Sequence, residues 1–166
     1  LCDRRQRQMC IRDRVNQVGG SSEIVYDGTS GALNKRGELV LMMKNFEEDF
    51  QIFDTEAEAT PVAVPSTYND RTRLVYEAAR CGLKGFFRKN NYEKAAIGLS
   101  GGIDSAVVAC IAADALGPEN VRALLMPSHF SSDESVEDAK ELARNLGIEY
   151  NVIPITEIYT LSLIHI

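Results

Sequence analysis

The sequence predicts an α/β fold: a parallel, doubly wound sheet preceded by a small β-meander. Between residues 95 and 155, apolar runs of strand length alternate with segments of helical periodicity in the order strand, helix, strand, helix, strand. A glycine-rich turn joins the first of these strands to its helix, and short apolar runs separated by turn residues lie upstream. Three parallel strands are few for such a sheet, so we expect the sheet to be incomplete.

The upstream meander is predicted from short extended stretches that alternate with turns. The stretches are residues 23–26, 31–34, 39–43 and 50–53. Turn chemistry separates them at Asp27-Gly28-Thr29-Ser30 and at Lys35-Arg36-Gly37. A meander of this size buries little apolar surface by itself, so we expect it to be the edge of a larger sheet.

A linker and a long helix follow the meander. Residues 55–67 contain Pro61 and Pro65, which prevent regular backbone hydrogen bonding and predict an interdomain linker. A helix is expected from residue 66 or 67 to residue 89, because apolar residues recur there every three or four positions. Gly82 and Gly85 each weaken this helix by about 1 kcal/mol relative to Ala and allow a break.

The alternating region predicts strands at residues 95–99, 121–126 and 150–155 and helices at 103–116 and 135–146. Gly117-Pro118 and Gly147 stand where helix stops are expected. Ser135, with Asp138 three residues later, resembles a capping pair at the start of the second helix.

Composition and charge exclude several classes of function. The 166 residues include 18 basic and 24 acidic side chains, a net charge of -6 that argues against general nucleic-acid binding. No apolar run approaches the roughly 20 residues needed to span a bilayer, and no signal peptide is evident, so we expect a cytoplasmic protein without membrane partners. The four cysteines show no paired metal-ligand spacing, so we expect unpaired thiols.

The chemically informative segment lies between the first parallel strand and its helix and reads Ser100-Gly101-Gly102-Ile103-Asp104-Ser105. Adjacent glycines let the backbone approach an anion, and the helix N-terminus offers N–H groups and a positive dipole end. Asp104 would repel a bare phosphate, so its presence suggests a bridging Mg²⁺. The alternative is an ordinary glycine-rich turn with Asp104 and Ser105 as helix caps. The loop matches neither the Walker pattern nor the dinucleotide fingerprint.

This loop resembles the pyrophosphate loop (PP-loop) of the ATP pyrophosphatases, which have an adenine-nucleotide α-hydrolase-like fold. Its surroundings, GLSGGIDSAVVA at residues 98–109 and LMPSHFSSDESVEDAKELARNLGI at 125–148, are similar to NAD synthetases. Residues 15–50 resemble the end of the nitrilase-like glutaminase domain of the glutamine-dependent members. That family commonly has Gln-Asp where this chain has Ser21-Ser22.

The resemblance implies a fragment of a carbon-nitrogen ligase with glutamine as amido donor. Residues 15–54 would end the glutaminase domain, 55–67 would link, and 68–160 would begin the synthetase domain. The complete enzyme, expected to be a homo-oligomer, would amidate nicotinic acid adenine dinucleotide with ATP and with glutamine or ammonia. An adenylylated intermediate would form, and AMP and pyrophosphate would be released. The glutaminase Cys, Glu and Lys are expected upstream of residue 15, and the fragment alone is expected to be inactive.

The resemblance also assigns binding residues in two loops. Asp104 would help to hold Mg²⁺, residues 98–105 would surround the phosphates of ATP, and residues 125–128 would border its adenosine. We expect His129 to be a solvated loop residue. The nucleotide-binding candidates are Gly98, Leu99, Ser100, Gly101, Gly102, Ile103, Asp104, Ser105, Leu125, Met126, Pro127 and Ser128.

Both ends of the chain resemble translated sequencing-adaptor DNA: RRQRQMCIRDR at residues 4–14 and LSLIHI at 161–166. We therefore expect residues 1–14 and 161–166 to be non-native. Removing the five Arg and two Asp of residues 1–14 leaves a net charge of -9. Cys81, Cys110 and His129 then remain as soft ligands, fewer than the four of a structural zinc site.

Three alternatives remain at this stage. Another PP-loop amidotransferase, such as a GMP synthetase, would share the loop but have an unrelated glutaminase domain. A non-catalytic nucleotide-binding module could have the same fold, since fold alone does not determine function. A purely structural domain would use the glycines only as a turn. ATP cleavage that depends on the dinucleotide acid would distinguish the synthetase from the binding module.

Overall fold

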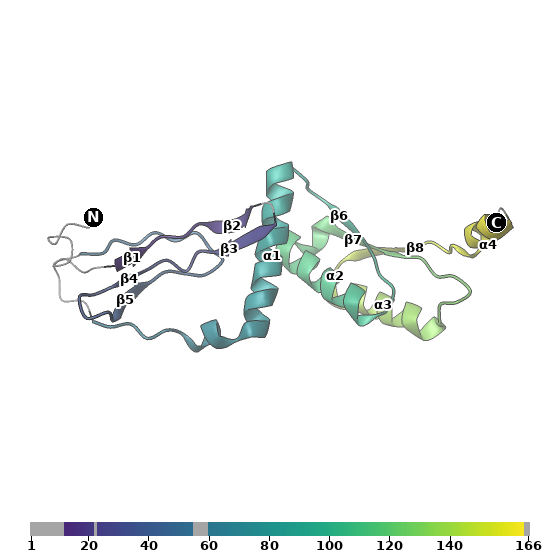
Figure 1. Ribbon diagram of the computed structural model, residues 1–166. Helices are drawn as coiled ribbons and strands as arrows, with labels where there is room; N and C mark the ends of the chain where they lie inside the picture. The colour runs from purple at the N-terminus through teal and green to yellow at the C-terminus, as the bar shows by residue number, and fades with distance from the viewer. Residues whose placement is uncertain (1–11, 22, 55–59, 165–166) are drawn as a thin grey trace. The chain divides into compact units, whose positions relative to one another are not determined.

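The computed structural model describes residues 12–21, 23–54 and 60–164 (Figure 1). Several predictions fall outside the described residues. They concern most of the expected non-native N-terminus with Cys2 and Cys10, Ser22, the first part of the expected linker, and His165. The chain divides into two compact units, one on each side of the boundary between Gly82 and Leu83.

The first unit contains two small antiparallel sheets. One sheet has the strand order β1 (Arg12–Arg14), β4 (Gly31–Leu33) and β5 (Leu39–Met42), and the other is the hairpin of β2 (Val18–Ser21) and β3 (Ile24–Asp27). Three of the expected extended stretches are therefore strands, whereas β1 and β2 were not predicted. The first unit has two antiparallel pairings beyond the predicted meander.

Side-chain hydrogen bonds form the turns of this unit. Asn34 Oδ1 accepts from the backbone N–H groups of Arg36 and Glu38 and so closes the turn between β4 and β5. Asp49 accepts from the backbone N–H of Lys44, and this hydrogen bond is the main reason that the pKa of its carboxyl is lowered. The prediction of a strand at residues 50–53 is wrong: these residues form no strand, and Phe50 and Ile52 are 84% and 88% exposed.

The long helix begins later than the sequence predicted. A 3₁₀ turn, η1 (Ser66–Asn69), precedes α1 (Arg71–Asn90), and the Asp70 carboxylate accepts a hydrogen bond from Arg73 N. Asp70 therefore acts as the N-terminal cap of α1. Gly82 causes no break; a side-chain Cβ there would lie 3.0 Å from Val25 Cγ2, so the glycine lets the β2–β3 hairpin pack closely on α1.

The second unit is the predicted α/β fold. Its parallel sheet has the order β6 (Ala95–Gly98), β7 (Val121–Leu125) and β8 (Glu149–Val152). The crossover helices are α2 (Ile103–Leu116) and α3 (Asp133–Leu146). The 3₁₀ turn η2 (Pro118–Asn120) precedes β7, and α4 (Thr156–Ile164), which was not predicted, follows β8. The final four residues of α4 belong to the segment expected to be non-native.

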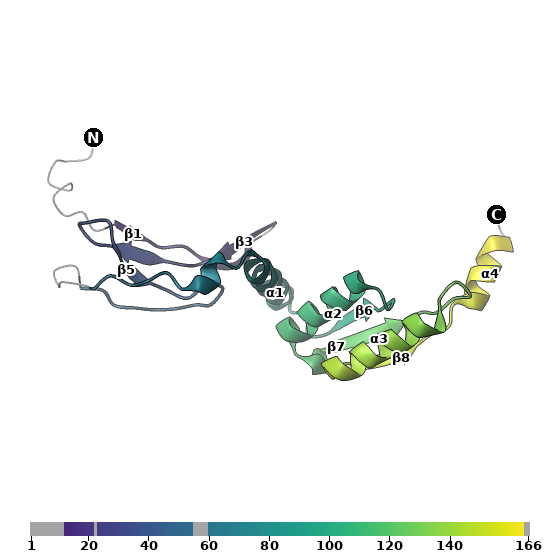
Figure 2. The same ribbon diagram turned by 90° about the horizontal axis from the view of Figure 1, so that it is seen from below.

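Both crossover helices cover the same face of this sheet. Val121, Ala123 and Leu125 alternate along β7 and are buried with residues of α2 and α3, and Figures 1 and 2 show the two helices side by side along the strands. On the opposite face, the exposed Arg122 of β7 forms an ion pair with Glu149 of β8. Sequential strands joined by right-handed crossovers place both helices on one face.

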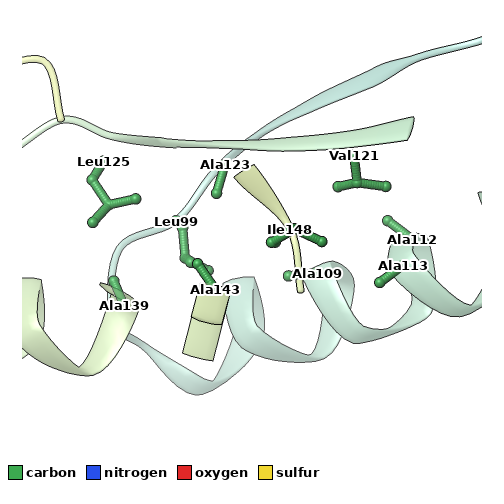
Figure 3. Packing of buried hydrophobic residues seen from close by; sticks show 10 residues of the cluster. All are labelled: Leu99, Ala109, Ala112, Ala113, Val121, Ala123, Leu125, Ala139, Ala143 and Ile148. Carbon is green, nitrogen blue, oxygen red and sulfur yellow. The ribbon is translucent and has the colours of Figure 1, made fainter. Parts of the chain in front are cut away.

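The core of the second unit is built from small side chains. Ala109 of α2, Ala123 of β7 and Ala143 of α3 have no exposed surface, and Leu125 is the only large side chain among the described residues that is fully buried (Figure 3). Alanines at these contacts let the helices lie close to the sheet. This close packing fixes the ends of the strands, where the candidate site is found.

The helix ends also differ in one respect from the sequence prediction. Gly117 and Gly147 end α2 and α3 as predicted, with φ values of +89° and +70°. The predicted capping pair of Ser135 and Asp138 is wrong: the N-cap of α3 is Ser132, whose Oγ accepts from Ser135 N at 3.1 Å. The helix starts one half-turn earlier because Ser132 has the extended backbone that an N-cap requires.

Candidate functional site

A cavity of about 260 Å³ opens at the carboxyl ends of β6 and β7. Parallel α/β sheets bind ligands at this edge, outside the ends of their strands. The walls are apolar apart from three serine residues, an arrangement suited to a largely apolar ligand group with a few polar anchors. The lining residues are Gly98, Leu99, Ser100, Leu124, Leu125, Met126, Pro127, Ser131, Ser135 and Val136.

The glycine-rich loop between β6 and α2 forms one side of this cavity. Gly101 has φ +80°, and a Cβ at this position would lie 2.2 Å from the backbone oxygen of Ser135. Both the backbone conformation and the lack of space therefore require glycine here. The loop passes directly against the first turn of α3.

Serine hydroxyls hold the loop in shape. Ser100 Oγ and Ser105 Oγ lie 3.0 Å apart, and Ser105 Oγ donates to the carbonyl of Gly102 at 3.0 Å. Gly102 N donates to Ser100 Oγ, and Ser100 N donates to Ser105 Oγ. These contacts fold the loop before any ligand is bound.

The N-terminus of α2 is open to ligands. Its N-cap is Gly102, which has no side chain to accept from the first-turn N–H groups, and Ile103 is 76% exposed. The alternative in which Asp104 and Ser105 cap the helix is therefore wrong, because the Ser105 hydroxyl bonds the Gly102 carbonyl instead. Unpaired N–H groups and the positive helix end together favour an anion at this place.

The loop after β7 forms the other side of the cavity. Met126 is 47% exposed and extends over Gly98, where a Cβ would lie 3.4 Å from the Met126 Cε. The loop closes in a turn in which Ser131 N donates to Ser128 O and Ser128 N donates to Ser131 Oγ. Ile155 N donates to Pro127 O, so the chain after β8 also supports this loop.

The structure brings the two predicted loops together. Six of the predicted residues line the cavity: Gly98, Leu99, Ser100, Leu125, Met126 and Pro127. The other six lie in the same loops but do not line it: Gly101, Gly102, Ile103, Asp104, Ser105 and Ser128. Four lining residues were not predicted to take part: Leu124, Ser131, Ser135 and Val136. Their only signal in the sequence was their position beside the end of β7, in the loop that follows it and in the first turn of α3.

Potential metal ligands are sparse. Within the described ranges, no group of three or more His, Cys, Asp or Glu side chains could hold a metal ion. Cys81 and Cys110 are free thiols of intermediate exposure. His129 stacks near Phe130, with ring centroids 3.9 Å apart. None of the described helices is long and apolar enough to cross a membrane.

Comparison with known sequences identifies relatives of the chain. The sequence model of the NAD synthase family matches residues 75–165, more than half of the chain. The glutamine-dependent NAD(+) synthetase of Aquifex aeolicus is 42% identical over 96% of this chain and 34% of its own length. That of Thermotoga maritima is 38% identical over 87% of this chain and 31% of its own length. The chain thus spans about a third of the length of these curated relatives.

Solved structures give the same grouping. A glutamine-dependent NAD⁺ synthetase from Acinetobacter baumannii, in complex with ADP, is 34% identical and superposes with a TM-score of 0.81 over 92% of this chain and 30% of its own. An NH₃-dependent NAD synthetase from Campylobacter jejuni is 35% identical, with a TM-score of 0.53, over 57% of this chain and 41% of its own. With the match of the family model to most of the second unit, these similarities show that the chain belongs to the NAD synthase family.

Proposed function

We propose that this chain is the ATP-binding part of a glutamine-dependent NAD(+) synthetase, a carbon-nitrogen ligase. The observation that supports this most is the cavity between the glycine-rich loop and the Met126-Pro127 loop, in a chain of the NAD synthase family. A relative from A. baumannii was solved with ADP, which agrees with an adenine nucleotide as the ligand.

The proposed reaction amidates nicotinic acid adenine dinucleotide in two steps. Its carboxylate oxygen attacks the α-phosphorus of ATP, the bond to the bridging oxygen breaks, and pyrophosphate leaves. Ammonia then attacks the adenylylated carbonyl carbon, AMP leaves with the bonding electron pair, and a proton is lost to give the amide of NAD. Neither step requires a covalent nucleophile from this chain, so its residues act by binding and orientation.

The two sides of the cavity match the two ends of ATP. The apolar lining around Leu125, Met126 and Pro127 is suited to adenosine. The N-terminus of α2 and the loop N–H groups would bind the phosphates. Positive helix ends and aligned donors stabilise charge on the leaving pyrophosphate.

The donor set at this end of α2 fits Mg²⁺ together with phosphate. Asp104 is an exposed carboxylate in the first turn of α2, and it is not part of a larger ligand group within the described residues. Mg²⁺ in nucleotide sites is commonly held by one or two carboxylates, phosphate oxygens and waters, so one Asp is enough. When bound, Mg²⁺ would neutralise phosphate charge. The Asp104 carboxylate would orient the ion.

Glutamine as the amido donor is supported by the first unit. The glutamine-dependent relative from A. aeolicus aligns with 96% of this chain, whereas the NH₃-dependent structure from C. jejuni covers only 57%. We therefore keep residues 15–54 as the end of a glutaminase domain and 68–160 as the start of the synthetase domain. We assign the glutaminase Cys, Glu and Lys to sequence outside this chain, and we propose a cytoplasmic, homo-oligomeric enzyme.

Calorimetric titration of the 166-residue chain with ATP, with and without Mg²⁺, tests the ATP site. We expect saturable binding that Mg²⁺ strengthens, and we expect Asp104→Asn to remove this strengthening because the carboxylate that orients the ion is lost. Glu141→Gln removes one charge from an exposed carboxyl of α3 away from the cavity and should leave binding unchanged. Binding that responds equally to both substitutions would contradict the proposed role of Asp104.

A further inference from the structure

The loop between β6 and α2 rests on the backbone of a different strand-helix unit. The space at the Cβ position of Gly101 is filled by Ser135: its backbone oxygen would lie at 2.2 Å, its carbonyl carbon at 2.8 Å and its Cα at 3.0 Å. Backbone atoms of a helix cannot rotate away as the tip of a side chain can. The position of the Ser135 backbone therefore limits where the loop can lie.

The place of Ser135 is in turn fixed by Ser132. Ser132 Oγ accepts from Ser135 N at 3.1 Å and lies 2.7 Å from Ser135 Oγ. Ser132 O also accepts from Val136 N at 3.3 Å. Ser132 itself does not line the cavity. The cap at Ser132 therefore acts on the candidate site only through Ser135, which lines the cavity.

We propose that Ser132 and Ser135 are positioning residues for the glycine-rich loop. The cap at Ser132 holds the Ser135 backbone, the Ser135 backbone holds Gly101, and Gly101 sets the position of the N–H groups that bind phosphate. This inference rests on the proposed function in taking that loop as the phosphate-binding element. Phosphate binding depends on aligned donors, so a displacement of about 1 Å has a large effect. The binding of adenosine, which the Met126-Pro127 loop borders, depends much less on the position of the glycine-rich loop.

Amide hydrogen exchange of the chain without nucleotide tests the coupling directly. In the loop, Gly102 N–H bonds Ser100 Oγ, and Ala106 N–H bonds Gly102 O. We expect Ser132→Ala to speed the exchange of both amides by about tenfold, because the loop loses its support. Ser132→Thr, which keeps a hydroxyl cap, should restore rates to within about twofold of the original chain.

Gly147→Ala is the matched control. Gly147 ends the same helix with φ +70°, and its nearest Cβ neighbour would be Pro118 Cβ at 3.9 Å. The substitution therefore weakens α3 at its far end without crowding the loop, and loop exchange should not change. Faster exchange at Ser135 in Ser132→Ala, with unchanged exchange at Gly102 and Ala106, would overturn the proposal by showing that the cap serves α3 alone.

Nucleotide titrations add a readout that simple destabilisation would not produce. In Ser132→Ala and Gly101→Ala, the affinity for Mg²⁺-ATP should fall about tenfold relative to the affinity for adenosine. In Ser132→Thr and Gly147→Ala, the ratio of the two affinities should stay constant. Equal loss of both affinities in Ser132→Ala would overturn the positioning role. If the unaltered chain bound no ATP, the proposed function would fail, while the exchange comparison would still decide the loop coupling.

Discussion

The hydroxyl of Tyr68 joins the turn before α1 to the end of β5. It donates to the carbonyl of Met43 at 3.2 Å. Burial, followed by the negative charge of Asp27, raises the pKa of the Tyr68 phenol. A raised folded-state pKa means that the folded chain favours the protonated phenol, so this contribution is complete below the ordinary pKa and is lost as pH rises through the folded value.

We therefore expect Tyr68→Phe to lower the free energy of unfolding by about 1 kcal/mol at neutral pH, the usual net value of one hydrogen bond. Tyr92→Phe is the matched control, because Tyr92 is 56% exposed and should cost less than about 0.5 kcal/mol. Urea unfolding at pH 7 and pH 11 measures both variants. The difference between the original chain and Tyr68→Phe should shrink at pH 11; a constant or growing difference would contradict the assigned pKa shift.

Several residue roles could be read from the sequence, and others could not. Gly147 was predicted as a helix stop because glycine alone enters the left-handed conformation without strain. Ser132 was missed as the N-cap of α3 because residues 131–135 comprise three serines and two acidic residues, each of which has cap chemistry. Gly101 was predicted to approach an anion, but its contact with Ser135 joins segments far apart in sequence and has no local signal.

At the scale of elements, small side chains let α2 and α3 pack closely on the sheet. Ala143 has no exposed surface and faces the sheet beside Ala109 and Ala123. Ala143→Leu should destabilise the chain by about 1–3 kcal/mol or more, because added methylene groups have no space in this core. Asn145→Leu, on the exposed side of the same helix, should change stability by less than about 0.5 kcal/mol. Similar melting temperatures for the two variants would argue against the close packing of α3 on the sheet.

The sequence predicted the regular elements of the second unit better than those of the first. Helix α2 was predicted from Ile103 to Leu116 as observed, and the three parallel strands agree to within three residues at each end. Local apolar periodicity and helix-ending glycines were enough to predict the elements of the second unit. Strand β2, with sequence VGGS, has no strand periodicity of its own and forms only because it pairs with β3. Such pairing depends on contacts that single-segment patterns do not contain.

At the scale of the whole molecule, the chain spans about a third of its curated relatives. Its described sheet has three parallel strands, with both crossover helices on one face and an exposed ion pair on the other. A parallel sheet is normally covered on both faces. We therefore keep the expectation that the 166-residue chain alone makes no NAD, although the cavity at the ends of β6 and β7 is formed.

We propose above that this chain supplies the ATP site of a glutamine-dependent NAD(+) synthetase. The most direct measurement replaces the aligned segment of the A. baumannii synthetase with residues 15–160 and assays NAD formation from nicotinic acid adenine dinucleotide, ATP and glutamine. We expect NAD together with equal amounts of AMP and pyrophosphate; this activity should be lost in Asp104→Asn and retained in Glu141→Gln. A folded hybrid that binds ATP but forms no NAD with glutamine or with ammonia would contradict it.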